Sequence, residues 1–251
     1  MKELIIQKAN ELGIEKIGFS KNSVVALFPY FVENEDGNLS MYARGVDYHI
    51  VAEEKLKQLS KVLEVFGAET EIHVDKGKHN DRQAAYEAGL GFYGMNGMLI
   101  NPGYGSYFFI GQIIHNLKIE PDIPDDRECL LCGRCERECP GRAIAGGKVD
   151  VGKCLSQITQ KRGELSESER TIVRANASCW GCDICQKVCP HNRGLETTAI
   201  PEFLEDRITT LRAEDIEGLS NKEFKEKYGR YAFSWRGKAV LLRNLRIYEK
   251  E

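Results

Sequence analysis

The sequence has no apolar run long enough to cross a bilayer, and it opens without the apolar segment of a secretory signal peptide. A twin-arginine export motif is missing as well. The first residues, "MKELIIQKANELG", instead show the spacing of an amphipathic helix that begins at once. These absences predict a cytoplasmic protein with no membrane partner.

A strong excess of charge of one sign is also missing. The 251 residues carry a formal net charge of only −3, so bulk electrostatics do not indicate a nucleic-acid-binding protein. The hydrophobic fraction is 42%, which is enough for a buried core in one or two domains.

Cysteine is absent from most of the chain, because all nine cysteines lie between Cys129 and Cys189. In a reducing compartment such crowding favours metal ligation over disulfides, and an odd number cannot pair completely within one chain. Eight of the nine form two copies of the pattern C-x2-C-x2-C-x3-C-P, in "CLLCGRCERECP" from Cys129 and in "CWGCDICQKVCP" from Cys179. Cys154 lies between the two copies.

The doubled pattern is that of bacterial two-cluster ferredoxins, in which the fourth cysteine of each run ligates the other cluster. Zinc is the competing metal, since C-x2-C pairs also build zinc sites. The cysteine before each proline favours two [4Fe–4S] clusters. The crossing rule assigns Cys129, Cys132, Cys135 and Cys189 to one cluster, and Cys139, Cys182 and Cys185 to the other. The last ligand is either Cys179 or Cys154, and spacing alone favours Cys179.

Before the cysteines, helical and alternating hydrophobic patterns follow one another and predict an α/β domain. The expected helices cover residues 2–12, 51–67 and 81–91, and the expected strands cover 14–20, 23–32, 69–75 and 105–117. "EPDIPDD" is rich in proline and acid, as linkers are. The predicted domains are 1–122, 123–195 for the cysteine segment, and 196–251 for a C-terminal helical segment.

Several motifs follow in order: "YARGVDYH", "HVDKG", "AGLGFYGMNGMLINPGYGSYFFIGQI", "KCLSQIT" and "GCDICQKVCPHN". Together they resemble the epoxyqueuosine reductase family, cobalamin-dependent iron–sulfur enzymes that make queuosine in tRNA. The resemblance runs from about Ser23 to Asn244. It implies an α+β fold, in which a nitroreductase-like α/β cobalamin-binding domain precedes a ferredoxin-like domain with two [4Fe–4S] clusters. Electrons would pass through the clusters to cobalt, which attacks the epoxide.

The resemblance also implies roles for single residues. Asp75 matches the proton donor of the family, for which its carboxyl must hold a proton near neutral pH. The cysteine of "KCLSQIT" is a cluster ligand in the family, which favours Cys154 as the fourth ligand and leaves Cys179 as an extra thiol. The residues expected on the cobalamin side are Arg44, Asp47, His49, Asn96, Leu99, Tyr104, Ile110 and Ser156.

The chain departs from the family in three places. Longer members carry HEAT-like repeats after "LLRN", some tens of residues are missing between "GFS" and "SVVALFPY", and Met95 stands where the family usually has lysine. The short form keeps nine basic and three acidic residues between Lys222 and Lys250, a composition that can contact the phosphates of tRNA.

The expected partners are tRNA carrying epoxyqueuosine and an electron donor such as ferredoxin or flavodoxin, and the expected state is a monomer. Two other functions fit the sequence. One is a corrinoid iron–sulfur reductase of another substrate, similar to reductive dehalogenases. The other is a two-cluster electron-transfer protein without corrinoid, which would leave the N-terminal domain without a role.

Overall fold

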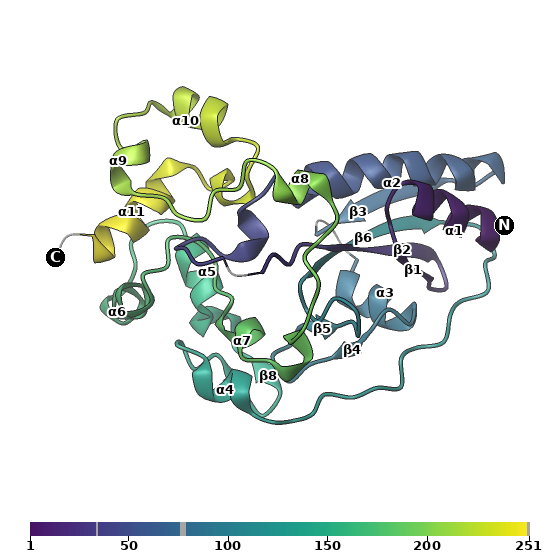
Figure 1. Cartoon of the computed structure of the whole chain (residues 1–251), viewed down its shortest axis with the longest axis horizontal. Helices are drawn as coiled ribbons and strands as arrows, with labels where there is room; N and C mark the ends of the chain where they lie inside the picture. The colour runs from purple at the N-terminus through teal and green to yellow at the C-terminus, as the bar shows by residue number, and fades with distance from the viewer. Residues whose placement is uncertain (34, 76–78, 250–251) are drawn as a thin grey trace. The chain divides into compact units, whose positions relative to one another are not determined.

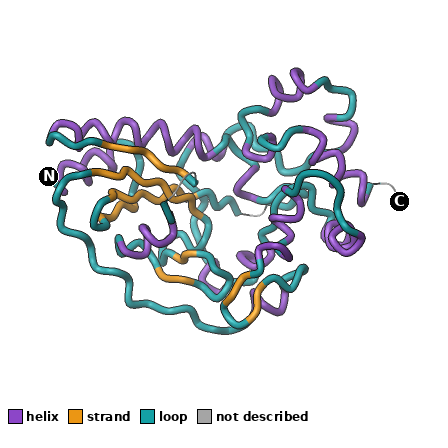
Figure 2. Tube along the Cα trace, turned by 180° about the vertical axis from the view of Figure 1, so that it is seen from behind, coloured by secondary structure: helices purple, strands orange, loops and turns teal. Residues whose placement is uncertain are grey.

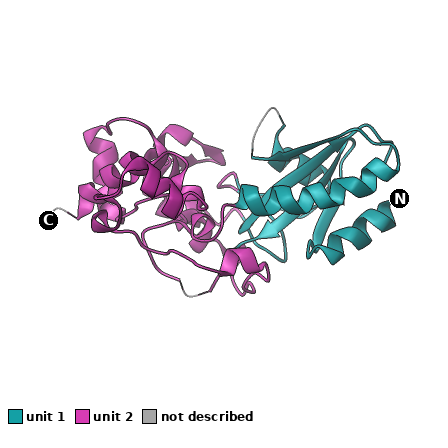
Figure 3. Ribbon diagram, turned by 90° about the horizontal axis from the view of Figure 1, so that it is seen from above, with its two compact units in different colours: residues 1–30, 48–94, 98–130 teal, residues 31–47, 95–97, 131–251 magenta. Residues whose placement is uncertain are grey.

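The computed structural model describes residues 1–33, 35–75 and 79–249. The chain divides into two compact units (Figure 3). Unit 1 comprises residues 1–30, 48–94 and 98–130, and unit 2 comprises 31–47, 95–97 and 131–251. The units do not follow the three predicted ranges one for one, because residues 31–47 and 95–97 group with the C-terminal part. The predicted boundary at residue 195 stays a prediction.

Unit 1 is built on a four-stranded sheet in the order β1-β2-β6-β3, with every neighbouring pair antiparallel. The expected strands all form, and each is shorter than its hydrophobic pattern. Mixed helix and antiparallel sheet confirm the predicted α+β class. The strands are β1 (Lys16–Phe19), β2 (Ser23–Pro29), β3 (Thr70–Val74) and β6 (Phe108–His115).

Helices cover both faces of this sheet (Figure 1). The helices are α1 (Lys2–Glu11), α2 (Tyr48–Val65) and α3 (Asp81–Glu87), with α1 packed on α2. Alternate residues of β2 serve the two faces: Val25 and Leu27 share a core with Ala85 of α3. On the α2 face, a side chain at Gly111 would come within 2.6 Å of Leu56. Glycine here therefore allows α2 to lie close to the sheet.

The sheet register sets which side chains meet near the end of β3. His73 pairs with Gln112 of β6, which in turn pairs with Val25 of β2. Paired residues share a face of an antiparallel sheet, so His73 and Gln112 lie on the face covered by α3. A short hairpin of β4 (Phe92–Tyr93) and β5 (Leu99–Ile100) completes the sheet structure of this unit.

Unit 2 consists of short helices joined by loops (Figure 2), as the many glycines and turns of the cysteine segment predict. Its two cysteine motifs form the matching helices α4 (Arg134–Glu138) and α7 (Ile184–Lys187), which pack on each other. A small apolar core joins α5 (Leu155–Gln160), α6 (Glu167–Asn176) and α11 (Lys238–Tyr248). The other elements are β7 (Ile144–Ala145), β8 (Lys148–Val149), α8 (Pro201–Leu204), α9 (Ala213–Ile216), α10 (Asn221–Tyr228) and four 3-10 turns at Met41–Ala43, Val151–Lys153, Pro190–Asn192 and Ala232–Ser234.

Across the residues described, none of the helices combines the length and the apolar character needed to span a bilayer.

Candidate functional site

Asp75 follows directly after strand β3 and is exposed. Its φ of 51° lies in the left-handed region, which residues other than glycine rarely adopt. Two hydrogen bonds hold it: its backbone N–H donates to Asp81 Oδ2 at 3.0 Å, and the Tyr48 hydroxyl donates to its Oδ2 at 2.6 Å. Such enforced conformations occur often at functional sites. Lys76 and Gly77 of the motif "HVDKG" lie outside the described residues.

Tyr48, the first residue of α2, stacks on two other rings. It stacks on Phe109 with centroids 4.0 Å apart and on His49 with centroids 4.2 Å apart. A ring packed in this way keeps its hydroxyl in one position, so that the carboxylate of Asp75 has a fixed donor. Tyr48 belongs to "YARGVDYH", but nothing in that motif marks its hydroxyl as a partner of Asp75.

Asp81 holds the backbone of Asp75, whose N–H donates to its carboxylate. Burial raises the pKa of Asp81 and the charge of Asp75 raises it further, against the hydrogen bonds from Gln112 and from the Asp75 backbone, which lower it. The side chain of Gln112 donates to the second oxygen of Asp81. No local sequence pattern predicts the roles of Asp81 and Gln112, because their approach depends on how α3 packs on the sheet.

Four of the predicted cobalamin-side residues belong to unit 1. Leu99 is buried in the core that α3 shares with the sheet, and Ile110 and Tyr104 pack against the same core. The Tyr104 hydroxyl donates to Glu15 Oε2 at 3.0 Å. Burial raises the pKa of Tyr104, and the Glu15 carboxylate adds to this increase. His49 stacks on Tyr48, whose hydroxyl donates to Asp75. The structure thus brings three of the four together.

Arg44 of unit 2 is 1% exposed and is engaged inside its own unit. Its Nε donates to the Leu39 carbonyl at 2.8 Å, and its Nη1 reaches the Glu35 carboxylate at 3.3 Å. Arg207 binds the same carboxylate, with Nε 2.7 Å from Glu35 Oε1. Burial raises the pKa of Glu35, but the bonds and charges of the two arginines outweigh it and lower that pKa. These contacts give Arg44 a structural role, and its predicted contact with cobalamin stays a prediction.

The remaining predicted contacts are spread over unit 2. Asp47 is half-buried, and its backbone N–H donates to the Arg230 carbonyl at 2.7 Å. Asn96 is buried. Ser156 lies on α5, where Gln160 Nε2 donates to its carbonyl at 3.1 Å. Their contacts with cobalamin stay predictions too.

One set of cysteines lies together in unit 2. Burial is the largest cause that raises the pKa of Cys182 to about 11 and that of Cys185 to about 12, and the charges of Cys139 and Cys154 contribute to both increases. These thiols are therefore close enough to act on one another. The backbone N–H of Ala143 donates to Cys139 Sγ at 3.2 Å, the type of bond that tunes iron–sulfur ligands.

Cys179 lies apart from this set. It is 0% exposed, and burial raises the pKa of its thiol, with a contribution from the charge of Glu249 but from no other cysteine. Its carbonyl accepts from Asn244 Nδ2 at 2.8 Å. Cys179 is therefore a core residue. Cys154, the residue just before α5, lies near enough to Cys185 for its charge to raise the pKa of that thiol, as Cys139 does.

The other predicted ligand set is Cys129, Cys132, Cys135 and Cys189. Cys129 belongs to unit 1, and Cys132, Cys135 and Cys189 belong to unit 2. Cys132 is exposed and the other three are half-buried. Gly133, in the left-handed region with φ 69°, begins α4 and turns the chain between Cys132 and Cys135. This ligand set stays a prediction.

Two domain families match the chain. Residues 128–192 match the 4Fe-4S double cluster binding domain, and residues 20–76 match the domain described as epoxyqueuosine reductase QueG, DUF1730. These matches include the cysteines and Asp75.

Named proteins match over longer ranges. An epoxyqueuosine reductase from Lactococcus garvieae is 40% identical over 221 residues, which are 86% of this chain and 62% of that protein. The solved epoxyqueuosine reductase from Streptococcus thermophilus matches with a TM-score of 0.88 at 31% identity, over 98% of this chain and 80% of that one. An epoxyqueuosine reductase solved with an epoxyqueuosine-modified tRNA-Tyr stem loop has a TM-score of 0.88 at 29% identity, with the same coverage of both chains. The reductive dehalogenase NpRdhA, at 20% identity and a TM-score of 0.57, shares the fold alone.

The chain spans 62% and 53% of the length of two curated relatives, from Lactococcus garvieae and Staphylococcus aureus. The double-cluster match confirms the two predicted [4Fe–4S] clusters, and the shared architecture confirms the predicted fold. Binding of cobalamin stays a prediction. Since the chain is 31% identical to the Streptococcus thermophilus enzyme and covers 80% of it, it belongs to the epoxyqueuosine reductase family.

Proposed function

We propose that this chain is a cobalamin- and iron–sulfur-dependent reductase that converts epoxyqueuosine in tRNA to queuosine. The observation that carries the proposal is the fixed carboxylate of Asp75, bound by the Tyr48 hydroxyl at 2.6 Å. A protein that only carried electrons between clusters would need no such group in unit 1. The proposed reaction takes place in the cytoplasm.

Reduction of the epoxide to the alkene takes up two electrons and two protons, breaks both C–O bonds of the ring and releases water. Cobalamin, held by the residues proposed below, would supply a low-valent cobalt nucleophile for the ring opening. Asp75 donates a proton to the oxygen set free by ring opening, and Tyr48 and Asp81 position Asp75 for this step. General acid catalysis of this kind contributes about a hundredfold or more.

The proposed cluster ligands combine the crossing rule for seven cysteines with the family resemblance, which favours Cys154 as the eighth. Cys129, Cys132, Cys135 and Cys189 hold one cluster, and Cys139, Cys154, Cys182 and Cys185 hold the other. The charges of Cys139 and Cys154 raise the pKa values of both Cys182 and Cys185, which supports the second set, while the charge of Cys135 also raises the pKa of Cys185. The electron donor is a reducing carrier such as ferredoxin or flavodoxin, and the protein acts as a monomer.

We also propose a division of labour along the chain. Residues 1–122 hold cobalamin and Asp75, residues 123–195 hold the clusters, and residues 196–251 support the core and contact tRNA. The proposed contacts with cobalamin are Arg44, Asp47, His49, Asn96, Leu99, Tyr104, Ile110 and Ser156.

Contact with tRNA is proposed through the C-terminal part of unit 2. Several of its basic groups are already engaged, such as Arg246 with Glu217 and Arg230 with Asp206. Trp235 is different: it is 56% exposed, and the Arg236 guanidinium lies 3.6 Å from its ring centroid. An aromatic face with a cation beside it is a surface on which nucleic-acid bases stack. Lys250 lies outside the described residues.

Trp235→Ala is expected to weaken binding of an epoxyqueuosine-modified tRNA stem loop by about tenfold, since one base–aromatic stack contributes about 1–3 kcal/mol. Filter binding or fluorescence anisotropy measures the loss. Phe66→Ala is the matched control, because Phe66 is also an exposed aromatic, at 40%, but lies outside the basic segment. Equal binding by Trp235→Ala and wild type would contradict stacking at this residue.

The proposed function is tested on protein purified without oxygen from cells supplied with cobalamin. We expect about eight irons per chain, the content of two [4Fe–4S] clusters, about one cobalt, and conversion of epoxyqueuosine in tRNA by a chemical reductant. Iron without cobalt, even after cobalamin is added, would exclude both corrinoid functions. The remaining function would then be that of a two-cluster electron-transfer protein. Cobalt and iron with no turnover of epoxyqueuosine would leave a corrinoid reductase of another substrate.

A further inference from the structure

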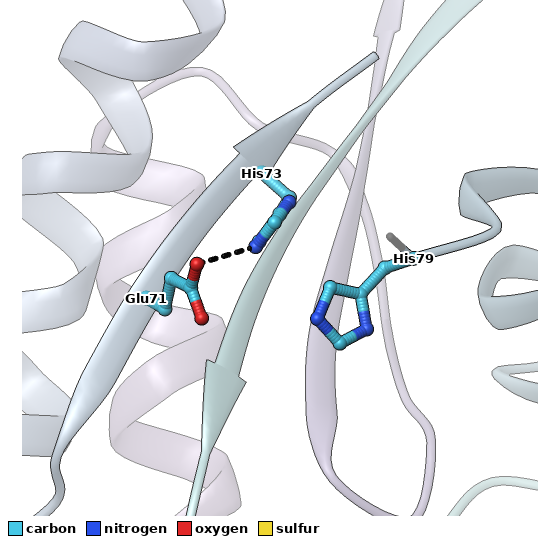
Figure 4. A group of neighbouring side chains, drawn as sticks. All are labelled: Glu71, His73 and His79. Atoms are coloured by element: carbon cyan, nitrogen blue, oxygen red, sulfur yellow. Dashed lines mark ion pairs between the residues drawn. The ribbon is translucent and has the colours of Figure 1, made fainter. Parts of the chain in front are cut away.

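We propose that Glu71, His73 and His79 form a binding site for one divalent transition-metal ion of the zinc class. Glu71 Oε1 lies 3.0 Å from His73 Nε2, and one ligand atom from each of the three residues lies within 4.8 Å of the others (Figure 4). This site is separate from the cysteines, and it does not depend on the proposed reaction.

The fold explains why these three side chains meet. Glu71 and His73 are two residues apart on β3, so their side chains leave the same face of the strand. His79 stands just before α3, and its ring meets that of His73 with centroids 4.5 Å apart at 72°. The neighbouring Asn80 caps α3 by accepting the Gln83 N–H at 3.2 Å. Two ligands therefore come from the sheet edge and the third from an anchored helix start.

The donor set selects the class of metal. Two imidazoles and one carboxylate are the ligands of zinc sites that keep a fourth position open for water. Calcium and magnesium prefer oxygen ligands alone, so imidazole nitrogen disfavours them. Of the three side chains, His73 is buried, whereas Glu71 and His79 are exposed.

Metal binding needs only a small rearrangement. Ligand atoms around a tetrahedral zinc at about 2.0–2.1 Å lie about 3.3 Å apart. The pair formed by Glu71 and His73, at 3.0 Å, is already near this spacing. The exposed side chain of His79 can close the remaining gap by rotation, with its backbone in place. A bound ion would then join the end of β3 to the start of α3, on either side of Asp75 in the sequence.

The test uses holoprotein with both clusters in place, so that iron occupies the cysteines. After equilibrium dialysis against zinc, wild-type protein is expected to retain one zinc per chain at unchanged iron. His79→Ala and His73→Gln are expected to bind it at least about a hundredfold more weakly, because losing an outer-sphere partner alone costs about 10–100-fold. Glu69→Gln, which removes an exposed acid just before β3, is the matched control and should bind zinc as the wild type does.

X-ray absorption at the zinc edge gives a second readout. The proposal expects nitrogen and oxygen neighbours at about 2.0–2.1 Å, whereas zinc on cysteine would show sulfur at about 2.3 Å. Equal zinc retention by wild type and His79→Ala would overturn the site and leave Glu71 and His73 as an ion pair. Zinc taken up with loss of iron, or with sulfur neighbours, would overturn it as well.

Discussion

Asp75→Asn is expected to lower the turnover of epoxyqueuosine in tRNA by at least about a hundredfold, the usual contribution of a positioned general acid. Asparagine keeps the size of the side chain and can accept the Tyr48 hydroxyl hydrogen bond, but its amide cannot donate a proton as a carboxyl does. Because the change lies outside the cysteines, iron and cobalt content should match those of wild type. Single-turnover kinetics with reduced protein measures the effect without interference from the electron donor.

Two further variants test whether the effect is specific to Asp75 and whether Tyr48 contributes to it. Glu87→Gln is the matched control, because it changes another exposed acid to its amide at the end of α3 and should leave turnover unchanged. Tyr48→Phe removes the donor at 2.6 Å from Asp75 but keeps the ring that stacks on Phe109. It should lower kcat by less than Asp75→Asn and leave KM unchanged. Full activity in Asp75→Asn would remove Asp75 from the reaction.

Cys154→Ala is expected to reduce the iron content from about eight to about four per chain, because one [4Fe–4S] cluster loses its fourth thiolate. Cys179→Ala should keep about eight irons. Its cost should be limited to stability, on the order of 1 kcal/mol for a small truncation in a packed core. Alanine is preferred to serine in both variants, since a serine hydroxyl could replace the thiolate as a ligand or remain buried without a partner.

Iron analysis together with electron paramagnetic resonance of the reduced protein checks this pair of variants. The two cysteines act as controls for each other, because each variant removes one thiol from unit 2. The opposite result, with iron lost from Cys179→Ala and kept in Cys154→Ala, would make Cys179 the ligand. The preference given by motif spacing would then be correct.

Much of the fold could be predicted because its signals are local. The alternation in "SVVALFPYFV" and the helical spacing in "VAEEKLKQLSKVLEVFG" follow from the repeat of strand and helix. β2 forms inside the first segment, and α2 covers most of the second but begins earlier, at Tyr48. The predicted end of this strand is less accurate, because β2 stops at Pro29 and residues 31–47 group with unit 2. A hydrophobic run does not show on its own where the chain leaves a sheet.

The sequence by itself determined the chemistry of the cysteines. Ligand spacing in a cluster motif depends on short turns, and such turns are encoded by neighbouring residues such as Gly133. The resemblance also pointed to Asp75. Both signals lie within short stretches of sequence, where the backbone geometry of a few residues decides the outcome.

Only the tertiary structure decided which distant residues meet. It brings Tyr48 to Asp75 across 27 positions of sequence, buries Arg44 against Glu35, and gathers Cys154 with the other thiols while Cys179 enters the core. No local pattern specifies these contacts, because they follow from how helices pack on a sheet or on one another and from which polar groups must be satisfied when buried.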